Sequence, residues 1–296
     1  MLASMKLTKQ MPPVSLVNET PLITIIIAVY NGSKTLQQCI DSVANQTYSN
    51  KEIIIIDGGS KDGTVDLLKL NNEHIAYWIS ESDRGIYNAW NKGLAQAKGD
   101  WICFLGADDY LWNAQVLEQI GAQLAIIPPN IRVAYSQIML LSNNGEVMHP
   151  IGEPWANIKE RFKQVMCIPH QGVMHSRSLF ELHGNFDESF RITGDYELLL
   201  RELKAGDAVF IPDLITTGMR QGGISSNPAN SVLAMQEIRR AQKMHGGIFP
   251  GWVWVAAMIR VYLRLFLWRV LGESVTRRVL DGYRRMRGLP SYWTKT

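Results

Sequence analysis

Short apolar runs and amphipathic stretches alternate along the first 125 residues of the chain. The apolar runs at 23–29, 52–56, 75–79 and 101–105 are typical of strands that are buried on both faces of a sheet. Helical spacing of apolar residues follows them at 33–46, 62–70, 86–97 and 114–125. This alternation predicts an α/β fold with a doubly wound, mainly parallel sheet.

The second half of the chain shows weaker patterns. Residues 131–141 and 147–151 flank Asn143-Asn144-Gly145, which is a hairpin turn signal. Helical spacing returns at 178–183 and 195–205, and a strand is expected at 208–211, ending at Pro212. We therefore predict a loose polar extension at 1–20, one domain at 21–226 with halves at 21–113 and 114–226, and a helical region at 227–296.

Composition supports a globular chain with a large core. Of the 296 residues, 46% are hydrophobic and 19% are charged, which excludes wholesale disorder. Cys39, Cys103 and Cys167 are far apart and lack CxxC spacing, so we expect reduced core residues of a cytosolic protein. The first apolar run comes too late and is too short for a signal peptide.

The segment 252–271 is apolar but is interrupted by Arg260, Arg264 and Arg269. A spanning helix needs about 20 apolar residues, and arginine near its middle costs a few kcal/mol. From residue 251 onward, nine basic residues face two acidic ones, whereas the rest of the chain is slightly acidic. This pattern predicts an amphipathic helix and basic tail at an anionic membrane surface, on its inner face. The alternative is a helix packed on the domain, with its arginines reaching water.

Two adjacent carboxylates, Asp108 and Asp109, follow the apolar run at 101–105. Open α/β sheets bind ligands at the carboxyl ends of their strands. Hard oxygen ligands suit Mg²⁺ or Mn²⁺, and these ions in turn suit a diphosphate. The pair therefore indicates a divalent metal site, and the alternative is a solvated turn that caps the next helix.

Polar turns also follow the three earlier strands. The first is Val29-Tyr30-Asn31, and the second is the glycine-rich segment 57–64, in which Asp57 can accept hydrogen bonds from a base or ribose. The third, at 81–93, brings Arg84 and Lys92 to a helix N-terminus, where they can face a diphosphate or form surface salt bridges. None of the turns matches a P-loop or GxGxxG.

Taken in order, these four turns resemble the corresponding motifs of the family 2 glycosyltransferases. Their sequences are V-Y-N, D-G-G-S-K-D-G-T, E-S-D-R-G-I-Y-N-A-W-N-K-G and L-G-A-D-D. The resemblance is close over 23–113 and continues more weakly to 226. It implies a GT-A fold, a nucleotide-sugar donor across the strand ends, a divalent metal on its diphosphate, and inversion of the anomeric centre in one displacement.

The resemblance assigns roles to several residues of the first half. It implies that Asp57 and Asp83 bind the nucleoside and that the Val29-Tyr30-Asn31 turn lines the base pocket. Asp108 matches the last acid of the DXD motif, and Gly106 stands where the motif has its first acid. Asp109 or a water is then expected to complete the metal coordination. Gly58 also departs from the pattern, because many relatives carry a second acid there.

The segment Thr193-Gly194-Asp195-Tyr196-Glu197 resembles the second acidic motif of the family, which makes Asp195 the expected general base. From the residue alone, Asp195 is an ordinary helix cap. His170 lies in a segment that resembles the one lining the donor or acceptor side, although a lone His is more often structural. The segment 220–225 is expected to close over the diphosphate, and its alternative is a plain surface turn.

These observations predict an inverting hexosyltransferase of envelope or exopolysaccharide biosynthesis that uses a saccharide acceptor, lipid-linked at the cytoplasmic face of a membrane. A non-catalytic nucleotide-sugar-binding or scaffold partner is the main alternative, supported by the missing first acid of the DXD motif. A nucleotidyltransferase would share the sheet and metal but release pyrophosphate. Nucleic acid is not an expected partner, because the basic residues lie beside Trp and Leu rather than in a groove-reading motif.

Overall fold

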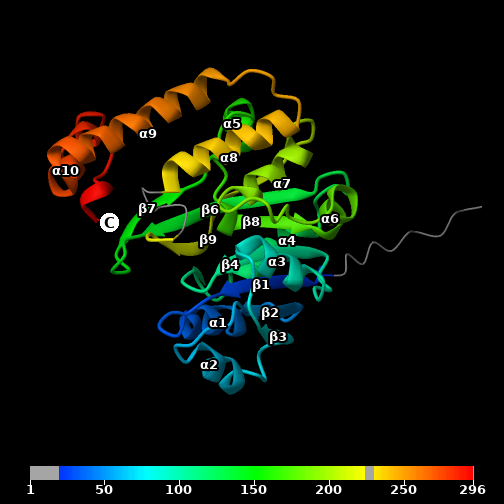
Figure 1. Ribbon diagram of the computed structural model, residues 1–296. Coiled ribbons are helices and arrows are strands. Elements are labelled where there is room, and N and C mark those ends of the chain that lie inside the picture. The colour runs from blue at the N-terminus through cyan, green and yellow to red at the C-terminus, as the bar shows by residue number, and fades with distance from the viewer. Residues whose placement is uncertain (1–19, 224–229, 296) are drawn as a thin grey trace, which may run out of the picture.

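A mixed sheet runs through the domain in the computed structural model, which describes residues 20–223 and 230–295 (Figure 1). Its strands lie in the order β3-β2-β1-β4-β8-β6-β9-β5, with β7 paired to β6. The strands are β1 (Ile23–Val29), β2 (Lys51–Asp57), β3 (Tyr77–Ser80), β4 (Trp101–Gly106), β5 (Tyr110–Leu111), β6 (Val133–Leu141), β7 (Val147–Ile151), β8 (Val173–Ser176) and β9 (Val209–Arg220).

Helices up to residue 244 pack on both faces of this sheet, and two further helices follow them and extend beyond it. The helices are α1 (Leu36–Ala44), α2 (Thr64–Leu70), α3 (Ile86–Leu94), α4 (Val116–Leu124), α5 (Trp155–Phe162), α6 (Arg177–His183), α7 (Gly194–Leu203), α8 (Ser231–Met244), α9 (Trp252–Leu271) and α10 (Glu273–Met286), with short 3-10 turns η1 (His170–Gly172) and η3 (Trp293–Lys295).

Strand direction divides the sheet into two halves. Strands β3, β2, β1 and β4 are all parallel, as the sequence pattern predicts, so their carboxyl ends meet at one edge. In the second half, β8 runs antiparallel to both β4 and β6, while β9 runs parallel to β6. The expected mainly parallel sheet is therefore correct for the first half, and the second half is mixed.

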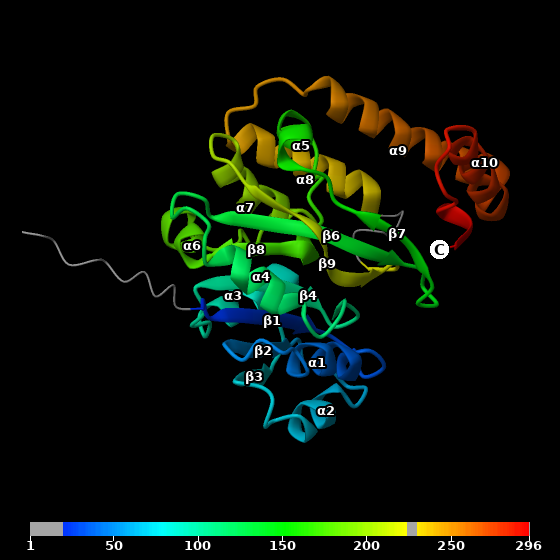
Figure 2. The same cartoon turned by 180° about the vertical axis from the view of Figure 1, so that it is seen from behind.

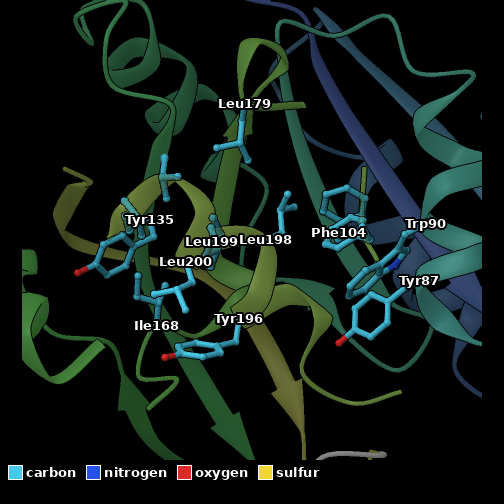
Figure 3. Packing of buried hydrophobic residues seen from close by; sticks show 14 of the residues in the cluster. Tyr87, Trp90, Phe104, Tyr135, Ile168, Leu179, Tyr196, Leu198, Leu199 and Leu200 are labelled. Atoms are coloured by element: carbon cyan, nitrogen blue, oxygen red, sulfur yellow. The ribbon is translucent and has the colours of Figure 1, made fainter. Parts of the chain in front are cut away.

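Alternating side chains of the central strands point to opposite faces of the sheet and belong to two separate hydrophobic cores. Ile25 and Ile27 of β1 join the core under α1, α2 and α4, whereas Ile26 joins the core under α3 and α5 to α8. In the second core, the rings of Trp90 and Phe104 lie 4.9 Å apart, with Tyr87 beside them (Figure 3). This two-sided burial explains why the strands are continuous apolar runs.

Strand β9 is longer than the sequence predicts. The strand was expected to end at Pro212, because proline cannot donate to a ladder. Instead, Asp213 adopts a positive φ of 56°, and the register against β6 shifts between Tyr135 and Gln137. The strand then continues to Arg220, since a bulge-like irregularity lets the ladder resume after a residue that cannot donate a hydrogen bond. This continuation carries the end of β9 to the same edge as β1 and β4.

The core extends beyond the predicted domain boundary at residue 226. Helix α8 contributes Met235, Ile238 and Ala241 to the same core as Tyr87 and Trp90. The boundary therefore does not separate α8 from the domain. The predicted extension at 1–20 lies almost wholly outside the described residues, as does part of the 220–225 loop.

Helix α9 lies over α8 and runs outward to α10, after which the chain returns toward β7 (Figure 2). Its inner face packs Trp254, Met258 and Val261 on the core. Of the arginines in this helix, Arg260 is exposed, whereas Arg264 is partly buried and donates to Ser231 Oγ. Within 20–223 and 230–295, the structure contains no helix long and apolar enough to cross a membrane.

The buried centre of β1 gives a direct test of this packing. Replacing Ile26, which is fully buried, by alanine should lower the free energy of unfolding by about 2–5 kcal/mol, because the cavity cannot collapse. The matched control Leu70→Ala, at a side chain 78% exposed, should change it by less than about 0.5 kcal/mol. Denaturant unfolding measures both, and equal effects would contradict the packing.

Candidate active site

A cavity of about 680 Å³ opens at the carboxyl edge of the sheet, between its two halves. The ends of β1, β4 and β9 and the first residues of α3 and α7 form its walls. Seven of the predicted site residues line it together: Val29, Tyr30, Asn31, Asp83, Asp108, Asp109 and Asp195. The structure therefore brings these side chains into one space at the carboxyl edge of the sheet, where open α/β sheets bind ligands.

A glycine shapes the side of the cavity near Tyr30 and Asp83. A Cβ atom at Gly58 would lie 2.5 Å from Asp83 Oδ2 and 3.4 Å from the Tyr30 ring. An open cleft lined by Gly58, Gly59 and Ser60 shares Tyr30 and Asp83 with this cavity. The absent second acid thus leaves space for the Asp83 carboxylate.

Asp57 does not line the cavity but holds the adjacent turn in place through hydrogen bonds. Its buried carboxylate accepts hydrogen bonds from Ser60 N at 3.0 Å, Gly59 N at 3.2 Å and Ser80 Oγ at 2.5 Å. Ser60 Oγ in turn accepts from Asn31 N at 2.6 Å, so Asp57 connects the first two turns. Asp57, which was predicted to bind the nucleoside, does not line either cavity, and its oxygens already accept hydrogen bonds from these donors.

Arg84 and Lys92 are held by acids outside the main cavity. Arg84 Nη2 lies 2.5 Å from Glu188 Oε2, and Lys92 Nζ lies 2.8 Å from Glu81 Oε1. Neither basic residue belongs to the cavity lining. The structure thus shows both residues in salt bridges and does not bring either to the acid pair Asp108 and Asp109 in this cavity.

His170 lies in the core behind the cavity. Its ring centroid is 5.0 Å from that of Trp90 and 5.8 Å from that of Phe104. Burial lowers the pKa of His170 to about 3, so the ring is neutral at physiological pH. It packs against the cavity wall formed by Trp90 and Phe104, and the structure does not bring it to the cavity as a donor-binding residue.

The two acids after β4 fold over Gly106. A Cβ at Gly106 would lie 2.8 Å from Asp108 Oδ1 and 3.1 Å from Asp109 Oδ2, and Gly106 N donates to Asp109 Oδ2 at 3.0 Å. Burial, and then the negative charge of Asp108, raise the pKa of Asp109 well above its usual range.

This pair fits a divalent cation. Mg²⁺ is commonly held by one or two carboxylates, with substrate phosphates and water completing its shell. No group of three or more metal-ligating side chains occurs in the part of the chain that the structure describes. Asp108 and Asp109 are thus suited to a cation that is shared with a diphosphate.

Asp195, at the start of α7, lines the same cavity as these acids. Tyr87 Oη donates to Asp195 Oδ1 at 3.3 Å, and Tyr196 N donates to the same oxygen at 2.9 Å. Burial raises the pKa of Asp195 to about 6, despite these hydrogen bonds that lower it. A carboxylate with such a pKa can accept a proton near neutral pH.

Glu237 of α8 fixes the segment that precedes Asp195. Its buried carboxylate accepts hydrogen bonds from the backbone N–H groups of Arg191 at 2.8 Å, Ile192 at 2.9 Å and Thr193 at 3.0 Å. No local sequence signal marks Glu237, because its partners lie more than 40 residues away. Helix α8 therefore helps to position Asp195.

Four further cavity residues were not assigned individual roles from the sequence: Arg191, Arg220, Gln221 and Tyr292. Arg220 and Gln221 fall in the segment expected to close over the diphosphate. The Nη2 atom of Arg220 donates to Gln38 Oε1 at 2.7 Å, and its charge favours the ionised form of Asp109. Arg191 and Tyr292 come from segments without a recognisable motif, and only the fold brings them here.

Known proteins match both the sequence and the fold. The family model described as Glycosyl transferase family 2 matches residues 24–128. The PGL/p-HBAD biosynthesis glycosyltransferase of Mycobacterium bovis (strain BCG / Pasteur 1173P2) is 31% identical over 184 residues, which cover 61% of this chain and 69% of the relative. The chain belongs to glycosyl transferase family 2.

Solved structures show that the fold of this family 2 glycosyltransferase is GT-A. S. aureus TarS 1-349 in complex with UDP-GlcNAc matches with a TM-score of 0.58 and 17% identity, over 74% of this chain and 66% of that one. The chain spans 38% of the longer TarS structure. Mannosyltransferase PcManGT from Pyrobaculum calidifontis, in complex with GDP-Man and Mn²⁺, matches with a TM-score of 0.58 and 16% identity. The match covers 90% of this chain and 81% of that one.

Close packing at the start of α7 gives a test of the site. A Cβ at Gly194 would lie 2.9 Å from the Tyr87 ring, so Gly194→Ala should displace Tyr87 from Asp195. We expect turnover of a nucleotide sugar to fall ~10- to 100-fold, since small misplacements of catalytic groups have such effects. Gly282→Ala, where the added atom meets nothing within 4 Å, is the matched control and should leave turnover unchanged. Similar turnover in the two variants would contradict the contact.

Proposed function

We propose that this protein is an inverting, metal-dependent hexosyltransferase that moves a sugar from a nucleotide-sugar donor to a hydroxyl of a saccharide acceptor. The observation that carries the proposal is the shared cavity, in which Asp83, the Asp108–Asp109 pair and Asp195 occupy different walls. This arrangement supports a nucleoside at Tyr30 and Asp83, a diphosphate at the acid pair, and an acceptor at Asp195.

The proposed reaction is one displacement at the anomeric carbon. The Asp195 carboxylate takes the proton of the acceptor hydroxyl as that oxygen attacks, and the new glycosidic bond forms. The bond from the anomeric carbon to the diphosphate breaks, and its electron pair leaves with the nucleoside diphosphate. A divalent cation, when bound at Asp108 and Asp109, would offset the charge on the diphosphate. Arg220, which lines the same cavity and acts electrostatically on Asp109, adds a positive charge.

Substituting the proposed base separates an enzyme from a binding module. Asp195→Asn should lower turnover about 10²- to 10⁴-fold, the usual contribution of a general base, while leaving donor affinity unchanged. Titration calorimetry with a panel of nucleotide sugars and Mn²⁺ measures donor binding, and release of nucleoside diphosphate measures turnover. Unchanged turnover would favour the non-catalytic scaffold, and release of pyrophosphate would favour a nucleotidyltransferase.

The pH dependence of turnover follows from the buried carboxylate. Asp195 must be ionised to accept a proton, so kcat should fall as the pH decreases through about 6. Tyr87→Phe removes a hydrogen bond that lowers the pKa of Asp195, so it should move this midpoint to higher pH. Steady-state rates between pH 4 and 9 test both expectations, and a midpoint that Tyr87→Phe leaves in place would count against Asp195 as the base.

The outer surface of the C-terminal helices supports a lipid-linked acceptor in envelope or exopolysaccharide biosynthesis. Exposed apolar side chains recur at helical spacing along α9, at Ile259, Leu263, Phe266 and Val270. Exposed arginines lie on the same two helices, at Arg260, Arg269, Arg278 and Arg285. Apolar area combined with positive charge suits an anionic membrane, which supports peripheral attachment to the cytoplasmic face. The relative named for PGL/p-HBAD biosynthesis is consistent with a biosynthetic role.

A single substitution tests the membrane surface. Phe266, which is 61% exposed, should insert into the headgroup region, so Phe266→Ser should weaken binding to phosphatidylglycerol vesicles by about tenfold. Leu182→Ser, at an exposed leucine of α6 in the body of the domain, is the control and should have no effect. Vesicle sedimentation measures both variants. Equal binding by the Phe266 variant and the unsubstituted chain would remove this part of the proposal.

A further inference from the structure

A buried amide without partners faces the cavity at the end of β9. The Gln221 side chain is only 6% exposed and belongs to the cavity lining. Within the described part of the chain, neither Oε1 nor Nε2 of Gln221 has a hydrogen-bond partner. Its backbone is fixed, because Gln221 N donates to Leu141 O at 3.0 Å. Buried polar groups in native proteins are nearly always paired, so this amide is suited to a ligand that supplies both a donor and an acceptor.

The C-terminal segment brings an aromatic ring to the same cavity. Tyr292 lines it although the residue lies about 70 positions beyond Gln221. The buried carboxylate of Asp281 in α10 holds this segment by accepting from Tyr292 N at 2.8 Å, Trp293 N at 2.9 Å and Thr294 N at 2.8 Å. Such charge-assisted hydrogen bonds are stronger than neutral ones and fix the backbone that carries Tyr292.

Helix α9 ties the segment to the domain. The Arg264 guanidinium lies 4.9 Å from the centre of the Trp293 ring and donates to Ser231 Oγ at the start of α8. Since Glu237 of the same helix α8 positions the loop before Asp195, one helix supports both the base and the C-terminal segment. The placement of Tyr292 is thus built into the fold.

These groups have the chemistry of a saccharide site. A planar amide can donate to one sugar hydroxyl and accept from another, and an aromatic ring offers a flat apolar surface to the C–H face of a pyranose. Both line the cavity that also holds Asp195. On the basis of the proposed function, we propose that Gln221 and Tyr292 form the subsite for the acceptor sugar, so that the C-terminal region completes the active site.

The test uses the full chain with 4-nitrophenyl hexosides as acceptor probes, in the presence of a nucleoside diphosphate and Mn²⁺. Saturation-transfer NMR should detect hexoside binding, and Tyr292→Ala and Gln221→Leu should each weaken it roughly ten- to a hundredfold. Tyr283→Ala is the matched control, because Tyr283 lies on α10 of the same C-terminal region, is 56% exposed and is not a cavity residue. It should bind hexosides as the unsubstituted chain does.

Two further readouts separate a binding role from a structural one. Because the Gln221 amide lacks partners, Gln221→Leu should leave the Tm unchanged or raise it, whereas a structural role requires a lower Tm. Affinity for the nucleoside diphosphate, measured by calorimetry, should stay unchanged in every variant.

The outcomes also separate this inference from the proposed function. Absence of nucleotide-sugar turnover with intact, Tyr292-dependent hexoside binding would overturn the proposed function alone. Absence of binding to any hexoside, equal losses in the Tyr292 and Tyr283 variants, or parallel loss of nucleotide affinity would overturn the acceptor subsite.

Discussion

The contact between α3 and the first turn of α7 determines the chemistry of the cavity. The Tyr87 ring packs on Gly194 so closely that no Cβ fits between them, and its hydroxyl reaches Asp195. From the other side, Glu237 accepts three consecutive backbone N–H groups before this turn. The Asp195 carboxylate is thereby held in a poorly hydrated position, which is the physical reason for its raised pKa.

The same arrangement separates like charges within one cavity. The acid pair Asp108 and Asp109 follows β4 and folds over Gly106, whereas Asp195 comes from the second half of the sheet. A cation and diphosphate at the pair would leave Asp195 free to act on an acceptor. The absence of the first DXD acid is thus compatible with a working site, because the space above Gly106 is used by Asp108 and by Asp109, which follows the motif.

The sequence was most informative where function depends on local pattern. Buried strands and the turns that follow them are contiguous in the chain, so β1 to β4 and the placement of Asp83 and Asp108 at one edge of the sheet could be predicted, whereas Asp195 was singled out only through the family resemblance. The sequence was least informative where partners are distant. Nothing near Arg84 reveals that Glu188, which is 104 residues away in the chain, holds it, and nothing near Asp57 shows that Ser80 at the end of the neighbouring strand donates to its carboxylate. Helix α8 and Tyr292 reach the site only through tertiary packing, which no local pattern encodes.

The most direct measurement of the central claim is a titration of the Asp195 carboxyl group itself. Carbon-13 NMR of the protein labelled at aspartate side chains, with Asp195→Asn to assign the signal, reports its protonation without any substrate. The account predicts a midpoint near pH 6. A midpoint near the ordinary aspartate value of about 4 would show that the carboxylate is well hydrated, and would contradict the role assigned to the packing of α3 against α7.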